Sequence, residues 1–350
     1  MKYLSILPIC LALLCLPISS CQNMQSQDTN PPKPAYALVI HGGAGTILKE
    51  NMTPEREAAY TAALQAALEA GEAVLKEGGS SKEAVVAAIQ LMEENPLFNS
   101  GVGAVFTHEE TVELDASFMD GATLNAGAVA GVKTVKSPIA AARMVMDSSV
   151  HVMLSGKGAE QFAEKMGLEM VENSYFHTER RLNQIKRIKD SQANATKAPY
   201  KGEMSIDGTD VYKFGTVGAA ALDKEGNLAA GTSTGGMSNK RYGRIGDSPI
   251  IGAGTYANNA SCAVSCTGHG EFFIRNVVAF DVAARMMYQD LSLEEAGDKV
   301  VQEVLMEMGG DGGLISVDKD GNVHMPFNTS GMYRGYVKST GETYIGIYKD

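Results

Sequence analysis

The sequence predicts an α+β fold in which helices cover β-sheets. Short apolar runs separated by turns, which are typical of strands, occupy residues 102–135. Two further pairs of apolar runs are joined by turns at residues 223–227 and 318–322, each with a glycine at its fourth position. Stretches with helical spacing lie between these pairs. The chain has 350 residues, 44% of them hydrophobic, which is enough for one large core or two modest ones.

Most elements have recognisable starts or ends. An apolar strand is predicted at residues 36–40, where the motif His-Gly-Gly-Ala-Gly follows. Thr53-Pro54 is typical of an N-cap and a first helical residue, and Ser80 and Glu83 have capping-box spacing. Helices are predicted from Pro54 to Gly78-Gly79, from Ser80 to Asn95-Pro96, and at residues 138–146, 156–166, 272–288 and 293–306. The hairpin strands are predicted at residues 216–222, 228–234, 314–317 and 323–325.

The segment 190–212 is polar and has few apolar anchors, so we expect a surface linker or a disordered segment there. Cys262 and Cys266 lie four residues apart on an extended segment, which places their side chains on one face but too far apart to bond. We expect two small buried thiols. No cysteine spacing typical of a zinc site is present.

The N-terminus has the features of an export signal. Residues 1–20 carry one lysine, a short apolar run and then small residues. Residues 18–21, Ile-Ser-Ser-Cys, resemble a bacterial lipobox, in which Cys21 is lipidated and becomes the mature N-terminus. The alternative is a plain cleaved signal with an incidental cysteine. Residues 21–35 are polar and fit a tether, so we expect an exported, periplasmic or cell-envelope lipoprotein whose only membrane contact is the lipid. The formal net charge of −11 argues against a nucleic-acid partner.

The polar linker ends at Gly215, and a clean strand begins at Thr216. If the chain were cut between these residues, Thr216 would carry both a hydroxyl and a free α-amine. That amine has a pKa of roughly 7.7–8.0, so it can accept the hydroxyl proton near neutral pH. Gly215 suits such a cut, because a residue without Cβ allows close approach and tolerates a strained peptide. The alternative is an ordinary threonine at the start of a strand.

Residues further along the chain add to this hypothesis. Thr234 ends the second strand of the hairpin and can lie beside Thr216. Arg244 and Asp247 form a cation–anion pair that can hold an amino acid's α-carboxylate and α-ammonium, or else a surface ion pair. The segment 267–270, Thr-Gly-His-Gly, is predicted to open a helix. Its N–H groups and hydroxyl could then face a developing oxyanion, unless it is only a glycine-rich helix entry.

Taken together, these motifs resemble the plant-type asparaginase family of N-terminal nucleophile hydrolases, over about residues 37–348. The resemblance rests on segments in the order in which that family has them. These are residues 41–45, 95–104, 119–121, 215–219, 232–236, 243–249, 252–259 and 267–268. It implies a four-layer αββα sandwich built as one domain from an α subunit (36–215) and a β subunit (216–350).

The resemblance also implies residue roles. Thr216 would cleave the Gly215–Thr216 bond and then attack substrate, with Thr234 orienting its hydroxyl and Asn99 in a supporting loop. Arg244 and Asp247 would hold the substrate's α-carboxylate and α-ammonium. Thr267 and Gly268 would form the oxyanion site, and Gly270 would contact the substrate amine. His269 departs from the small residues around it, and we expect a solvent-facing side chain or one that tunes substrate access.

A structural sodium ion is the only ion that the resemblance implies, and no catalytic cofactor is expected. Its ligands would be the backbone carbonyls of Met92, Glu93, Asn95, Phe98, Ser100 and Val102, which suit a hard cation. The implied assembly is an (αβ)₂ heterotetramer.

The resulting hypothesis is a self-cleaving threonine amidohydrolase that releases L-aspartate from β-aspartyl (isoaspartyl) peptides and from L-asparagine. Its substrate would be a small molecule or a dipeptide. One alternative is a glycosylasparaginase, which shares nucleophile and architecture. Another is a non-catalytic surface lipoprotein that binds amino acids.

Overall fold

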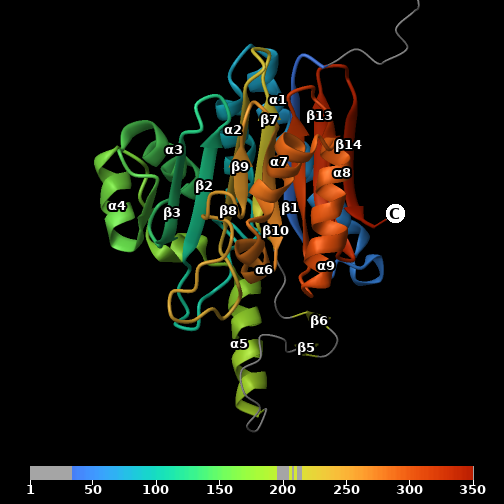
Figure 1. The fold of residues 1–350 in the computed structure, drawn as a ribbon. Helices are drawn as coiled ribbons and strands as arrows, with labels where there is room; N and C mark the ends of the chain where they lie inside the picture. Colours follow the sequence, from blue (N-terminus) through green and yellow to red (C-terminus); the bar gives the residue numbers. More distant parts are fainter. Residues whose placement is uncertain (1–33, 195–204, 207–208, 211–214, 350) are drawn as a thin grey trace, which may run out of the picture. The chain divides into compact units, whose positions relative to one another are not determined.

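The structure is a computed structural model that describes residues 34–194, 205–206, 209–210 and 215–349. The predicted signal (1–20), Cys21 and nearly all of the tether lie outside these residues. Within them the fold is α+β, as predicted, with two main sheets and helices packed against both (Figure 1). None of the described helices is both long and apolar enough to cross a membrane.

The larger sheet has eight strands in the order β14-β13-β1-β7-β8-β2-β3-β4. All neighbours are antiparallel except the pair β3–β4. Its strands are β1 (Ala37–Gly45), β2 (Leu114–Asp120), β3 (Ala126–Val132), β4 (Met153–Ser155), β7 (Val217–Leu222), β8 (Leu228–Thr234), β13 (Gly331–Lys338) and β14 (Thr343–Tyr348). Strand β1 therefore joins the C-terminal strands to the central hairpin β7–β8.

The smaller sheet has four antiparallel strands in the order β12-β11-β10-β9. They are β9 (Thr255–Ala257), β10 (Cys262–Gly268), β11 (Gly312–Asp318) and β12 (Val323–His324). Cys262 and Cys266 lie on β10 as free, buried thiols, which confirms that prediction.

Three apolar clusters hold the helices and sheets together. The first joins α1 (Pro54–Lys76), α2 (Ser81–Glu93) and α3 (Pro138–Ser148) to the larger sheet, through residues such as Leu38 and Ile40. The second joins the two sheets and contains Val39 on the opposite face of β1 and Ile315 on β11. This alternation follows from the two-residue period of a strand. The third packs the smaller sheet against α6 (Gly270–Asn276), α7 (Val278–Gln289) and α8 (Leu293–Asp298), and Figure 1 shows α7 and α8 in front of the strands.

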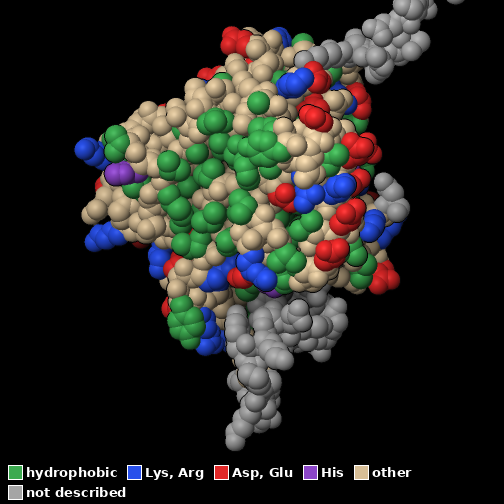
Figure 2. All heavy atoms as spheres, in the orientation of Figure 1, with side chains coloured by type: hydrophobic (Ala, Val, Ile, Leu, Met, Phe, Trp, Pro, Cys, Tyr) green, Lys and Arg blue, Asp and Glu red, His purple; other side chains and the backbone are tan. Residues whose placement is uncertain are grey.

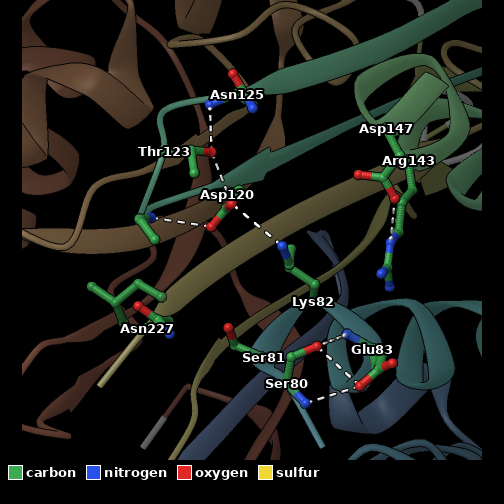
Figure 3. A network of polar contacts seen from close by, with 12 residues as sticks. Ser80, Ser81, Lys82, Glu83, Asp120, Thr123, Asn125, Arg143, Asp147 and Asn227 are labelled. Atoms are coloured by element: carbon green, nitrogen blue, oxygen red, sulfur yellow. Dashed lines mark hydrogen bonds and ion pairs between the residues drawn. The ribbon is translucent and has the colours of Figure 1, made fainter. Parts of the chain in front are cut away.

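Several local predictions are confirmed. Thr53 caps α1, because its hydroxyl accepts from the N–H of Arg56. Ser80 and Glu83 form the reciprocal bonds of a capping box at the start of α2 (Figure 3). Beside it, Lys82 of α2 reaches Asp120 at the end of β2, with 3.4 Å between Nζ and Oδ2. The predicted helix 156–166 corresponds to α4 (Gly156–Lys165). Both hairpin glycines, Gly226 and Gly321, have positive φ.

Several predictions were wrong in detail. The first strand does not end at residue 40, because β1 continues through the glycine motif to Gly45 after a register shift between His41 and Gly43. The predicted linker 190–212 begins inside helix α5 (Glu179–Asn194), since the buried Ile185 and Ile188 hold that helix on the core. Two short strands also fall within that segment, β5 (Ser205–Ile206) and β6 (Thr209–Asp210).

The helix predicted over 272–288 is two helices, α6 and α7, because Val277 between them adopts a left-handed conformation. The helix predicted over 293–306 runs from α8 through a π-helical turn (Lys299–Val304) into α9 (Leu305–Glu307). Two 3₁₀ turns, Lys49–Asn51 and Asn173–Phe176, complete the regular elements of the described chain.

Candidate active site

Thr216 and Thr234 lie side by side at one end of the central hairpin. Thr216 immediately precedes β7 and Thr234 is the last residue of β8, and the register pairs Val217 with Ser233. The Thr216 hydroxyl donates to the Thr234 hydroxyl oxygen at 3.0 Å. Both side chains are buried, so little water competes for this bond. The pairing predicted from the hairpin is therefore present in the structure.

The Thr234 hydroxyl makes two further hydrogen bonds. Its hydroxyl donates to the carbonyl of Asn99 at 3.5 Å and accepts from the N–H of Gly236 at 3.0 Å. Asn99 in turn anchors the loop, because its side chain bonds to Val105 and Gly236. The loop expected at Asn99 thus contacts Thr234 directly.

Gly215 is held between two neighbours. Its carbonyl accepts from the N–H of Asn99 at 3.0 Å. A Cβ added to Gly215 would lie 2.8 Å from the Asn99 Cβ, and one added to Gly43 would lie 2.5 Å from the Gly215 Cα. The need for glycine at the predicted cleavage site therefore comes from this close packing.

A small cavity of about 10 Å³ opens beside the two threonines. It brings together five of the residues singled out from the sequence, namely Thr216, Thr234, Arg244, Asp247 and Gly268. Gly270 lies directly behind Arg244 and Asp247, since a Cβ there would meet atoms of both at 2.9 Å. Two threonine hydroxyls, a guanidinium group and a carboxyl group thus surround a space with room for about one water.

Asp247 is a buried carboxyl group with an unsatisfied oxygen. The residue is 4% exposed, and its Oδ2 has no hydrogen-bond partner among the described residues. Burial raises the pKa of Asp247 from 3.8 to about 7, against the opposing effect of the Arg244 charge. A buried, unpaired carboxylate oxygen is costly unless a donor arrives. An ammonium group entering the cavity would supply that donor.

Arg244 makes its ion pair with Glu271 rather than with Asp247. The Glu271 carboxylate accepts two bonds from the guanidinium, from Nε at 2.9 Å and from Nη2 at 2.8 Å. His269 also contacts Glu271, with 3.3 Å between Nε2 and Oε2. The sequence reasoning missed Glu271, although it directly follows the Thr-Gly-His-Gly motif on α6. His269 is partly exposed, with a side chain that is 25% accessible.

Thr267 and Gly268 differ from the prediction in their local structure. They are the last residues of strand β10, and the helix begins only at Gly270 after His269 as N-cap. The Thr267 hydroxyl accepts from the N–H of Ala44 at 3.3 Å. The β10 pairing with β11 continues to Gly268 and so sets the position of both residues.

A group of buried hydroxyls joins β8 to β9 and β10. Thr232 lies within 2.6 Å of both Thr255 and Ser265, oxygen to oxygen. Ser265 bonds to Nε2 of His41 at 3.0 Å, and burial lowers the pKa of His41 to about 3. A neutral His41 therefore packs beneath β7. The sequence reasoning missed this group, because serine and threonine on strands carry no spacing signal.

The predicted sodium loop follows α2. The Glu93 carbonyl accepts from the N–H of Val102 at 2.7 Å, which closes the loop. A carbonyl oxygen has a second lone pair, so this donor set suits a hard cation, and the sodium site stays a prediction. The Glu93 side chain instead turns inward and accepts bonds from Ser137, Ile139 and Ser233. Burial raises the pKa of Glu93 to about 7. Among the described residues, no group of His, Cys, Asp and Glu is arranged to hold a metal ion.

Comparison with known proteins agrees with the motifs. A model of the family described as asparaginase matches residues 34–347. The chain belongs to the asparaginase family. Over 315 residues this asparaginase-family chain is 53% identical to a protein named isoaspartyl peptidase from Escherichia coli strain K12, with 89% of the chain and 96% of that protein covered.

Two more distant relatives have similar coverage. One, from Xenopus laevis, is named isoaspartyl peptidase/L-asparaginase and is 38% identical over 312 residues, which is 89% of this chain and 94% of that protein. The other, from Pyrococcus abyssi, is named plant-type L-asparaginase and is 41% identical over 305 residues, covering 86% of this chain and 96% of that protein. The family that the sequence motifs indicated is thereby confirmed.

Proposed function

We propose that this chain is a self-cleaving threonine amidohydrolase that releases L-aspartate from β-aspartyl peptides and L-asparagine. The observation that carries the proposal is the 3.0 Å bond from the Thr216 hydroxyl to Thr234, beside a cavity lined by Arg244 and Asp247. The names of the relatives, isoaspartyl peptidase and plant-type L-asparaginase, support the same substrates.

Self-cleavage comes first. Thr216 Oγ attacks the Gly215 carbonyl carbon, the peptide C–N bond breaks, and an ester forms between Gly215 and the Thr216 oxygen. Water then hydrolyses that ester. The products are a carboxylate on Gly215 and a free α-amine on Thr216. The packing of Gly215 between Gly43 and Asn99 supports this step, because it fixes the position of the carbonyl that Thr216 would attack.

Substrate hydrolysis uses the new amine as the base. With a pKa of roughly 7.7–8.0 it takes the Thr216 hydroxyl proton, and Oγ attacks the side-chain carbonyl of the aspartyl unit. The proton then passes to the leaving nitrogen, so ammonia or a peptide amine departs. Water hydrolyses the acyl-enzyme and aspartate is released. The Thr267 hydroxyl and the Gly268 N–H would stabilise the oxyanion.

The substrate's α-groups define the rest of the site. Asp247 Oδ2 is the buried acceptor for the α-ammonium. Arg244 would bind the α-carboxylate, and Glu271 holds that guanidinium in place through two bonds. Gly270 leaves room for this arrangement, since any side chain would press on Arg244 and Asp247.

The proposal also covers the layered architecture, the assembly and the export of the protein. The packing of α1–α3 on the larger sheet, of sheet on sheet, and of α6–α8 on the smaller sheet supports a four-layer αββα sandwich of α (36–215) and β (216–350) subunits. Hydrophobic side chains gather on the face around α7, which supports assembly into an (αβ)₂ form (Figure 2). Export and lipidation at Cys21 rest on the sequence of residues 1–21.

A substrate panel tests the proposal. We expect aspartate from β-Asp-Leu and from asparagine and none from a glycosylated asparagine. Release from the glycosylated substrate alone would favour a glycosylasparaginase. Tight amino-acid binding without any product would favour the non-catalytic lipoprotein. A Thr216→Ala variant is the matched control and should release no aspartate from any of them.

A further inference from the structure

A second cavity, of about 60 Å³, adjoins the predicted cleavage site, and Gly215 is part of its wall. Three arginines also line it, namely Arg56 of α1 and Arg180 and Arg181 of α5. Helices from distant parts of the sequence thus bring three positive charges to one small space beside the scissile bond. About 60 Å³ is room for several waters or for one carboxylate group.

These guanidinium groups have no carboxylate partner among the described residues. Arg181 bonds to the Gly103 carbonyl at 2.6 Å and to Gln184 at 2.9 Å. Arg180 bonds to the carbonyls of Pro96 and Leu97. Arg56 stands over the Tyr60 ring at 5.8 Å. All these contacts are neutral, although arginines that converge in a protein usually meet an anion.

The electrostatics agree with a missing anion. Arg181 is only 7% exposed, and burial, together with the nearby charge of Arg180, lowers its pKa to about 9. Burial raises the pKa of the Tyr60 phenol, but the charges of Arg180 and Arg56, together with hydrogen bonds from Arg56 and Tyr333, outweigh this effect, so the pKa lies below its ordinary value. A bound anion would relieve both effects.

The chemistry of the proposed function places the leaving group on this side. The free amine of Thr216 must give its proton to the leaving nitrogen, so that nitrogen lies next to the amine. In the uncut chain this amine is bonded to the carbonyl carbon of Gly215, and Gly215 is one of the residues that line the cavity with the three arginines. Departure of Gly215 therefore leaves the space between the nucleophile and the arginines to the substrate's leaving group.

We propose that Arg56, Arg180 and Arg181 form a subsite for the α-carboxylate of the leaving amino acid in a β-aspartyl dipeptide. The inference rests on the proposed function and adds a substrate preference to it. Asparagine releases ammonia, which has no carboxylate to place in the subsite. The enzyme should therefore have a higher kcat/KM for isoaspartyl dipeptides with a free C-terminal carboxylate than for asparagine or for amidated peptides.

The test compares β-Asp-Leu with β-Asp-Leu amide, which differ only in that carboxylate, and uses asparagine as the reference. Mature wild-type enzyme should favour the free acid over the amide in kcat/KM by roughly 10- to 150-fold, the range for a charge-assisted hydrogen bond. In Arg56→Gln and in Arg180→Gln that acid-to-amide ratio should each fall by about tenfold. Arg187→Gln, an exposed arginine on the same helix, should keep the wild-type ratio.

Equal wild-type kcat/KM for acid and amide would overturn the inference. That result would mean that the cavity binds something else, such as the new carboxylate of Gly215. An equal loss of kcat/KM on all three substrates in Arg56→Gln and Arg180→Gln would also overturn the inference. Arginines with a merely structural role would lower the activity on the acid, the amide and asparagine alike. Asparagine turnover by the wild type distinguishes failure of the arginine subsite from failure of the proposed function. If it is present, the proposed function stands whatever the acid-to-amide ratio; if all three substrates are inert, both fail.

Discussion

Asp247→Asn separates substrate binding from self-cleavage. The substitution removes the negative charge at the one buried carboxylate oxygen of the cavity that lacks a donor, Asp247 Oδ2. A hydrogen bond to a charged partner contributes about 1.5–3 kcal/mol, which corresponds to roughly a 10- to 150-fold loss in kcat/KM for asparagine and β-Asp-Leu. Self-cleavage should proceed, because Asp247 bonds to neither Thr216 nor Gly215 in the structure.

The pH profile adds a second signature. The pKa of Asp247 is raised to about 7, so the free enzyme holds a neutral carboxyl group below that pH and cannot pair with an ammonium. Wild-type kcat/KM should therefore rise as pH increases through about 7. Bound substrate stabilises the carboxylate and lowers its pKa, so this step should be absent from kcat. The Asn variant should lack the step in kcat/KM as well.

Stability measurements complete the case for Asp247. Because its folded-state pKa is raised, the wild type loses stability as pH rises from about 3.8 to about 7, and the Asn variant avoids that loss. The assay is steady-state kinetics across this pH range, with thermal unfolding of both proteins. An Asn variant with wild-type kcat/KM and an unchanged pH profile would refute the reasoning about the ammonium site.

Three further changes have defined outcomes. Thr234→Val removes the partner of the Thr216 hydroxyl and should slow self-cleavage by about tenfold or more, whereas Thr234→Ser should keep the wild-type rate. Gel densitometry over time measures the cleavage rate. Equal rates for the Val and Ser variants would count against the pairing. Gly43→Ala places a methyl 2.5 Å from the Gly215 Cα at a positive φ and should block cleavage, while Gly158→Ala in open space should not; normal fragments from Gly43→Ala would contradict the packing argument. Glu93→Gln removes a buried acid whose pKa is about 7. The free energy of unfolding in urea should therefore fall between about pH 4.5 and 7 for the wild type and not for the variant. The same pH dependence in both proteins would contradict this prediction.

The fold was predictable where local chemistry decides it. The caps at Thr53 and Ser80 and the turns with Gly226 and Gly321 are set by neighbouring residues, and the structure has all of them. The extent of helix α5 was not predictable, because the helix is stabilised by the packing of a few apolar residues on the core, which is distant in the sequence. The extension of β1 to Gly45 likewise depends on pairing with β13, some 290 residues away in the sequence.

The candidate site was predictable in its residues and not in its contacts. The ordered motifs indicated Thr216, Thr234, Arg244, Asp247 and Gly268, which line one cavity. Nothing in the spacing showed that Arg244 pairs with Glu271, or that three arginines converge beside Gly215. Such contacts join elements that only tertiary packing brings together.

Cleavage of the bond before residue 216 is the event on which the whole account depends. Intact mass spectrometry of the mature protein, with N-terminal sequencing of the smaller fragment, measures it directly. The wild type should give two chains, the smaller beginning at Thr216, and Thr216→Ala should give one chain without activity. A wild type that turns over substrate as a single unbroken chain, or a Thr216→Ala variant with full activity, would contradict the account.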